Sequence, residues 1–264
     1  MMKMVDPNEE MKQVQEIEVQ EQPKDTLEYW PITDLPSKFK LYPEGTKILG
    51  RKLNVIEVKK LGLMNDITSD FVITEILKST IKGIDINKIY QADKLYLLLW
   101  LRANTFNEPG YSIDYHCIHC DKDSTYDFTL NKLDVKYLDE EFFKNNEIKL
   151  KSGDTLRLNF LTVKDEEIID KFKIEFAKMN LNDDILELAQ QIKLINGENL
   201  PLINKYEYLT KLDVTEYLKI EAIMKKYDFG IRPFINVKCP LCGGDSPVGI
   251  TFRKSFLVPE YRIG

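Results

Sequence analysis

Histidine and cysteine are scarce in this chain of 264 residues, which has only two histidines and four cysteines. Both histidines, His116 and His119, stand beside the first two cysteines. The sequence also lacks the short motifs of phosphate-binding loops, dinucleotide-binding turns, zinc proteases and serine hydrolases. Because no nucleophile is paired with a base and no acid–base pair is evident, we expect neither an enzyme nor a small-molecule substrate.

Long apolar runs are missing as well. No stretch approaches the roughly 18 apolar residues of a transmembrane helix, so no membrane span is expected. Residues 1–25 lack the apolar core of a secretion signal, and we therefore expect folding in the cytoplasm. The net charge is −6 and the isoelectric point is near 5.2, which makes nucleic acid an unfavourable partner. The 43% hydrophobic content is nevertheless enough for a sizeable core.

The four cysteines form two Cys-x-x-Cys pairs, Cys117 with Cys120 and Cys239 with Cys242. Each pair is typical of a zinc knuckle, a tight turn that directs two thiolates at one point, and two knuckles complete a closed tetrahedral site for structural zinc. A proline inside the second pair and two glycines after it favour the turn that such a site needs. Since 118 residues separate Cys120 from Cys239, a shared zinc ion would join the two ends of a large folded insert.

Other interpretations of these residues stay open at this point. The pairs could be redox-active thiols or disulfides, although strand-like flanks are not the usual setting of a redox Cys-x-x-Cys motif. His116 or His119 could replace one thiolate and give a Cys₃His site. The acidic runs at 139–141 and 165–167 could bind a hard cation, but we expect solvated surface and helix starts there.

Composition and turn signals divide the chain into five expected parts. In chain order these are a polar tail, disordered or ordered by a partner, over residues 1–28; a strand and helix region over 29–110; a split zinc ribbon made of 111–130 with 231–256; an inserted α+β region over 131–230; and a C-terminal tail over 257–264. The apolar segment Phe256–Pro259 either docks on the core or binds a partner, and we expect docking.

Apolar periodicity and capping residues predict six helices. They are Val55–Met64, Asp70–Lys82, Gln91–Ala103, Asp165–Met179, Asp183–Gln191 and Asp213–Asp228, with Asn54 and Thr162 as N-caps of the first and fourth. Alternating residues predict a hairpin around each cysteine pair, a third hairpin within 148–161 and a strand at Ile192–Ile195. The expected fold class is α+β: a split Cys₄ zinc ribbon with a large, mostly helical insert and short antiparallel hairpins.

Several segments in a fixed order carry a family resemblance. They are the turn-rich stretch Leu35–Thr46, the strand ending at Arg51–Val55, the apolar helix Tyr96–Thr105 that leads into the first cysteine pair, the stretch Phe160–Glu166, and the distal Cys-Pro-x-Cys-Gly sequence. This order resembles the T4-type baseplate hub and hub-assembly proteins of contractile-tailed bacteriophages, over roughly residues 33–256. One departure is Phe39-Lys40, where the family usually has a glycine in the first turn.

The resemblance implies a non-enzymatic role. It suggests a component or assembly factor of the baseplate hub, with other hub and tail proteins as partners and with structural zinc. The expected location is the host cytoplasm during assembly and the virion tail baseplate afterwards. The alternatives are a zinc-ribbon protein that binds nucleic acid, which would need a basic, aromatic surface around the knuckles, and an enzyme that uses zinc as a scaffold.

Overall fold

The computed structural model describes residues 28–63, 69–106, 110–232, 234–250, 257 and 258. Within these ranges the protein has eight α-helices and small antiparallel sheets of two or three strands. The expected mixture of helices with short antiparallel hairpins is therefore confirmed. In the same ranges, no helix is both long enough and apolar enough to cross a membrane.

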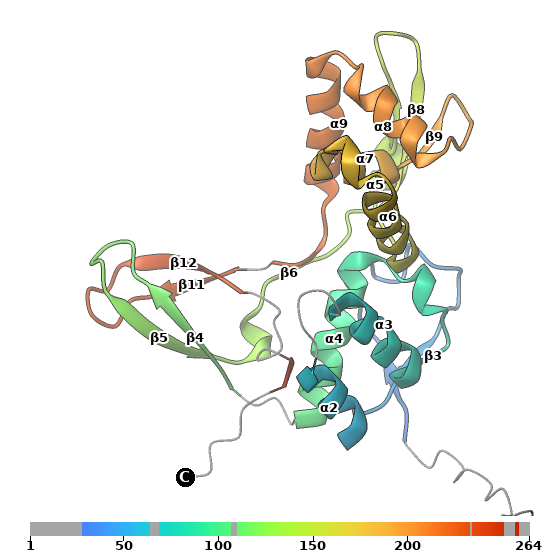
Figure 1. Cartoon of the computed structure of the whole chain (residues 1–264). Helices are drawn as coiled ribbons and strands as arrows, with labels where there is room; N and C mark the ends of the chain where they lie inside the picture. Colours follow the sequence, from blue (N-terminus) through green and yellow to red (C-terminus); the bar gives the residue numbers. More distant parts are fainter. Residues whose placement is uncertain (1–27, 64–68, 107–109, 233, 251–256, 259–264) are drawn as a thin grey trace, which may run out of the picture.

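The N-terminal region combines one small sheet with three helices (Figure 1). The strands β1 (Trp30–Ile32), β2 (Ile48–Gly50) and β3 (Ile81–Lys82) pair antiparallel in that order. The helices are α2 (Val55–Leu63), α3 (Ser69–Thr80) and α4 (Gln91–Phe106), and the short 3₁₀ turn η1 covers Ile86–Lys88. The leucine-rich run of α4 is buried at Leu97, Leu98, Leu99 and Leu101, so α4 forms the centre of this region as its sequence predicts.

The helix predicted over Asp70–Lys82 ends earlier than expected, at Thr80. Ile81 and Lys82 instead pair with β2, a long-range contact that helical periodicity does not reveal. The turn after β3 depends on Gly83, whose φ is +91°. A Cβ atom at this position would lie 1.9 Å from the carbonyl oxygen of Lys47, so only glycine fits there.

The first turn, between Ser37 and Tyr42, contains no glycine. Lys38 and Phe39 both have left-handed backbone conformations, with φ of +48° and +59°. Buried Asp93 holds both ends of this turn, because its carboxylate accepts hydrogen bonds from the Ser37 amide at 3.0 Å and from the Tyr42 hydroxyl at 2.6 Å. These long-range bonds offset the strain of two non-glycine residues in the left-handed region.

A capping box at the start of α2 confirms the predicted cap. The Asn54 side chain accepts from the Glu57 amide, and the Glu57 carboxylate accepts from the Asn54 amide. The same carboxylate forms a buried, two-pronged ion pair with Arg51, at 2.7 and 2.9 Å. Burial opposes this charge, but the hydrogen bond from Arg51 and the other donors outweigh it and hold the pKa of Glu57 below its usual value.

Two hairpins stand to one side of the helices (Figure 1). The first consists of β4 (Tyr111–His116) and β5 (Asp123–Phe128), and the second of β11 (Phe234–Lys238) and β12 (Asp245–Gly249). Buried residues of both hairpins, among them Tyr115, Phe128 and Val237, belong to the same hydrophobic cluster as the N-terminal helices. Leu257 also lies in this cluster and is 2% exposed, which confirms docking at that residue, whereas Phe256 and Pro259 lie outside the described residues.

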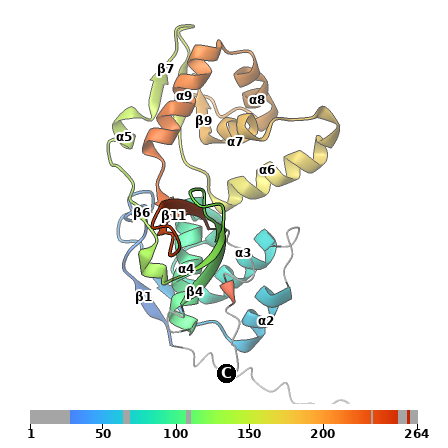
Figure 2. The same cartoon turned by 90° about the vertical axis from the view of Figure 1, so that its left-hand side faces the viewer.

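The residues between the hairpins form a separate group of helices around a three-stranded sheet (Figure 2). The strands β7 (Glu147–Lys149), β8 (Thr155–Leu158) and β9 (Ile192–Ile195) pair antiparallel. The helices are α5 (Phe142–Asn145), α6 (Val163–Glu175), α7 (Asp183–Gln191), α8 (Leu202–Thr210) and α9 (Val214–Tyr227). Two further strands, β6 (Val135–Lys136) and β10 (Gly230–Ile231), pair where the chain enters and leaves this group. The expected division into domains remains a prediction.

Thr162 caps α6 as predicted, within a capping box that it forms with Asp165. The helix ends at Glu175, and the residues up to Met179 form the 3₁₀ turn η3 (Ala177–Met179) in place of the expected continuation. Asn180 then takes a left-handed conformation, which reverses the chain.

A buried lysine links α6 to the N-terminal helices. The Lys94 ammonium on α4 contacts Glu166 of α6 at 2.8 Å and Asp70 of α3 at 3.2 Å, and its side chain is only 8% exposed. Breaking such a contact leaves a charge with little access to water, so Lys94 fixes the insert against the helices below it.

Candidate metal centre

The four cysteines come together at one end of the two hairpins. Cys117 directly follows β4, and Cys239 directly follows β11, so each strand delivers its first cysteine to the same place. Both of these residues are buried, whereas Cys120 is half-buried and Cys242 is exposed. Among the described residues, this is the only set of three or more potential ligand side chains that converges on one point.

The two cysteine turns share one backbone hydrogen-bond pattern. In the first, the Cys117 amide donates to the Lys122 carbonyl, and the Asp121 amide donates to the Cys117 carbonyl. In the second, Cys239 and the two glycines Gly243 and Gly244 repeat these two bonds. The residue after the second cysteine is left-handed in both turns, with φ of +56° at Asp121 and +72° at Gly243.

The glycine of the second turn was expected to allow a positive φ, and this is confirmed. The first turn uses an aspartate for the same purpose, which the sequence analysis missed. The signal that could have revealed it is the tolerance of Asp for left-handed backbone, a preference that it shares with Asn.

The sulfur positions fit a tetrahedral metal site. The Sγ atoms of Cys117 and Cys242 are 3.8 Å apart, those of Cys120 and Cys239 are also 3.8 Å apart, and all four lie within 4.8 Å of one another. A regular tetrahedron with metal–sulfur bonds of about 2.3 Å has sulfur–sulfur edges of about 3.8 Å. The four cysteines are free thiols, so the disulfide interpretation does not describe this structure.

Backbone amides prepare one thiol of each turn for deprotonation. The amides of His119 and Cys120 donate to Cys117 and lower the pKa of its thiol to about 5. The amides of Cys242 and Leu241 likewise lower the pKa of Cys239. Burial, together with the hydrogen bonds and charge of the neighbouring cysteines, raises the pKa of the Cys120 thiol to about 12. A second thiolate beside the first would have no compensating charge. A bound cation would supply that charge, since a coordinating thiol is deprotonated.

The two histidines make other contacts. His119 Nε2 lies 2.7 Å from the backbone carbonyl of Asp245, so this side chain bridges the two cysteine turns. His116 contacts Asp121 and Asp123 with its two ring nitrogens, and these hydrogen bonds raise its pKa. The described geometry therefore favours four thiolates over a Cys₃His set.

Tight packing of the two turns supports the thiol arrangement. A Cβ atom on Gly244 would lie 2.5 Å from the His119 ring, so glycine is required for the turns to approach. The Ser246 hydroxyl donates to the Cys117 sulfur at 3.6 Å, and the Gly244 amide donates to the Cys242 sulfur at 3.4 Å. The sequence analysis missed Ser246, which carries no local signal of this role.

The acidic run at the start of α6 has protein partners. Asp165 completes the capping box and accepts from Gln190, Glu166 pairs with Lys94, and Glu167 pairs with Lys164 and Lys171. These contacts agree with the expectation of a helix start in place of a hard-cation site.

The comparison with protein families found a match that covers most of the chain. The family described as T4 bacteriophage base plate protein matches residues 32–258. No curated protein and no solved structure matches the chain. The matched region includes the four cysteines, both hairpins and the whole insert, and a structural family of this kind favours a non-enzymatic role at the virion tail in contact with other tail proteins. The chain belongs to the T4 bacteriophage base plate protein family.

Proposed function

We propose that this protein is a non-enzymatic component or assembly factor of the baseplate hub of a contractile-tailed phage, and that it carries one structural zinc ion. The family match over residues 32–258 is the observation that carries the proposal of a baseplate role. The proposal of a hub position is based on the segment order described above. The convergence of four thiols supports zinc.

Cys117, Cys120, Cys239 and Cys242 would hold the metal. A closed site with four thiolates has no free position for chemistry, and its contribution is to folding. Closing a loop of about 120 residues costs little more than closing a short one, since each doubling of length adds about 0.6 kcal/mol. A structural zinc site worth roughly 10 kcal/mol or more offsets that cost easily. The metal would thus fix both ends of the insert in one place.

The charge of the two hairpins argues against the nucleic-acid alternative. Residues 111–128 and 234–249 contain five aspartates and only two lysines. A surface that binds the phosphate backbone needs clustered Lys and Arg, because phosphate contacts supply most of the non-specific affinity. The hairpins instead present net negative charge, which favours protein partners. We propose hub and tail proteins as those partners, met first in the host cytoplasm and then in the assembled tail.

A complementation experiment tests the baseplate role. Phage with a nonsense mutation in this gene would be grown with plasmid-borne wild-type protein, with Cys239→Ser, or with no protein, and the lysates examined by electron microscopy. We expect tails and baseplates only with the wild-type protein. Normal baseplates in lysates that contain no copy of this protein would overturn the proposal. Mass spectrometry of purified virions then distinguishes a retained component from an assembly factor that leaves.

A further inference from the structure

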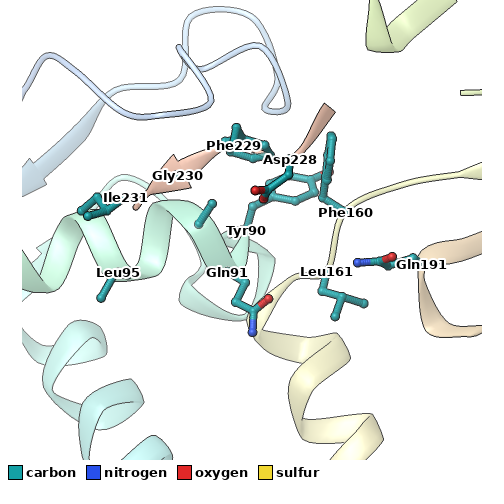
Figure 3. Close-up of a pocket in the computed structure, with 11 residues that line it drawn as sticks. Tyr90, Gln91, Leu95, Phe160, Leu161, Gln191, Asp228, Phe229, Gly230 and Ile231 are labelled. Carbon is teal, nitrogen blue, oxygen red and sulfur yellow. The ribbon is translucent and has the colours of Figure 1, made fainter. Parts of the chain in front are cut away.

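A hollow of about 300 Å³ lies where the insert meets helix α4. Figure 3 shows that its lining brings together the aromatic rings of Tyr90, Phe160 and Phe229 from three distant parts of the chain. Leu95 and Ile231 add further apolar surface. This hollow therefore suits an aromatic or large aliphatic side chain.

A second hollow of about 320 Å³ lies between α7 and α9. Its apolar lining comprises Leu188, Met224 and Tyr217, of which Leu188 and Met224 are buried. Four carboxylates also line it, from Asp184, Glu187, Glu221 and Asp228, against the single ammonium of Lys225. Lys225 lies 3.4 Å from Glu221, which leaves three carboxylates without a cation among the lining residues.

Two of these carboxylates affect the ionisation of Tyr217 in the lining. Burial raises the pKa of Tyr217, and the nearby carboxylates of Glu221 and Asp184 raise it further. These two carboxylates therefore lie close enough to the Tyr217 side chain to act on it. A cationic side chain placed there would meet carboxylates at its charged end and apolar surface along its stem.

The two hollows share Gln191 and Asp228, so they adjoin. The pair of neighbouring hollows is called here the junction groove, with an aromatic half and an acidic half. Its carboxylates do not converge on a single point, since the cysteines are the only converging ligand group among the described residues. The groove is therefore suited to an extended ligand with separated charges and not to a metal ion.

We infer that the junction groove binds a short segment of another phage tail protein, in which an aromatic or large aliphatic residue is followed by lysines or arginines. The apolar residue would enter the aromatic half, and the basic side chains would cross the acidic half. The tail origin of this partner rests on the proposed function, whereas the chemistry of the segment rests on the groove. Since the groove is built by both α4 and the insert, the bound segment would hold these two parts together.

Direct binding tests the chemistry of the segment. The probe is a fluorescein-labelled synthetic peptide, Gly-Trp-Leu-Lys-Arg-Lys-Gly, followed by fluorescence anisotropy with the full chain. Two control peptides replace the basic residues by glutamine or the Trp-Leu pair by alanine. We expect the parent peptide to bind more tightly than both, and its binding to weaken at high salt. Equal binding of the three peptides would overturn the inference.

A matched pair of variants locates the binding site. The double variant Asp184→Asn with Glu187→Gln removes two groove charges that have no cation among the lining residues, and Asp170→Asn with Glu175→Gln removes two exposed charges from α6. We expect the groove variant to bind the parent peptide about fivefold more weakly, the loss typical of two partly exposed ion pairs, and the α6 variant to bind as the wild type does. Equal weakening by both variants would show a general charge effect and contradict the assignment.

Cross-linking in infected cells identifies the natural partner. A photo-reactive amino acid replaces Tyr217 in the groove or, as control, Ile174, which is 78% exposed on α6. We expect only the groove position to cross-link a tail protein, at a segment with the stated sequence character. A cross-link to a second copy or to the same chain would overturn the inference. Peptide binding that depends on the groove, in a protein whose loss leaves baseplates normal, would contradict the proposed function alone.

Discussion

The contact between Gly244 and His119 provides a sensitive test of how the two cysteine turns fit together. In Gly244→Ala, the new Cβ atom would lie 2.5 Å from the ring and 3.0 Å from the Cβ of His119, so rotation of the ring alone does not relieve the clash. The turns must separate, which strains the thiol cluster and the 2.7 Å contact between His119 and the Asp245 carbonyl. Overpacking and one weakened hydrogen bond together should cost about 2 kcal/mol.

The assay is urea unfolding of four proteins in a double-mutant cycle. His119→Ala alone should cost about 1 kcal/mol. Gly244→Ala added to it should also cost about 1 kcal/mol, because the 3.0 Å contact with the Cβ of residue 119 remains, and this gives a coupling of about 1 kcal/mol. Gly249→Ala on the same hairpin is the control, because no atom lies within 4 Å of its new Cβ, and its effect should be within about 0.5 kcal/mol. Additive effects of the two substitutions would refute the proposed packing.

Three further predictions concern the framework around the site. Gly83→Ala should lower the free energy of unfolding in urea by about 3 kcal/mol or more, because the new Cβ atom clashes with the backbone. Gly153→Ala, with a similar φ of +97° but no atom near the new Cβ, should cost about 1 kcal/mol. Equal costs would contradict the clash. Lys94→Met should lower the free energy of unfolding by about 2 kcal/mol, since Glu166 is left without its cation, and an unchanged midpoint would show that the link is not stabilising. The pKa of Glu57 is lower in the folded protein than its unfolded value near 4.5, so ionised Glu57 stabilises the fold above that pH. This stability is lost as the pH falls through the folded pKa. Glu57→Gln should therefore flatten the dependence of the free energy of unfolding on pH in that range.

Local signals in the sequence were sufficient for much of the framework. The bounds of α7 agree with the predicted Asp183–Gln191, and the caps at Asn54 and Thr162 are both present. The spacing of the cysteines was enough to predict that the two pairs meet, because each turn is a local structure with a known pattern. At these caps and turns, the contact is made between residues only a few positions apart, so the local sequence is enough to predict it.

Long-range contacts explain the elements that the sequence analysis missed. Strand β3 forms where Ile81 pairs with Gly50, a residue 31 positions earlier in the chain, and the local sequence around Ile81 does not reveal this pairing. Helix α8 begins after Pro201, which forms no side-chain cap hydrogen bond, so the Asn or Thr caps that marked other helices were absent here. The junction groove combines residues from Tyr90 to Ile231, and only the folded chain brings them together.

The metal content of the protein tests the central claim most directly. The chain would be purified without added metal, analysed for zinc by elemental analysis, and unfolded for a count of free thiols. The convergence of Cys117, Cys120, Cys239 and Cys242 predicts one zinc ion per chain and four reduced thiols. A protein that is folded and free of metal, with four reduced thiols that take up no zinc when it is supplied, would contradict the account.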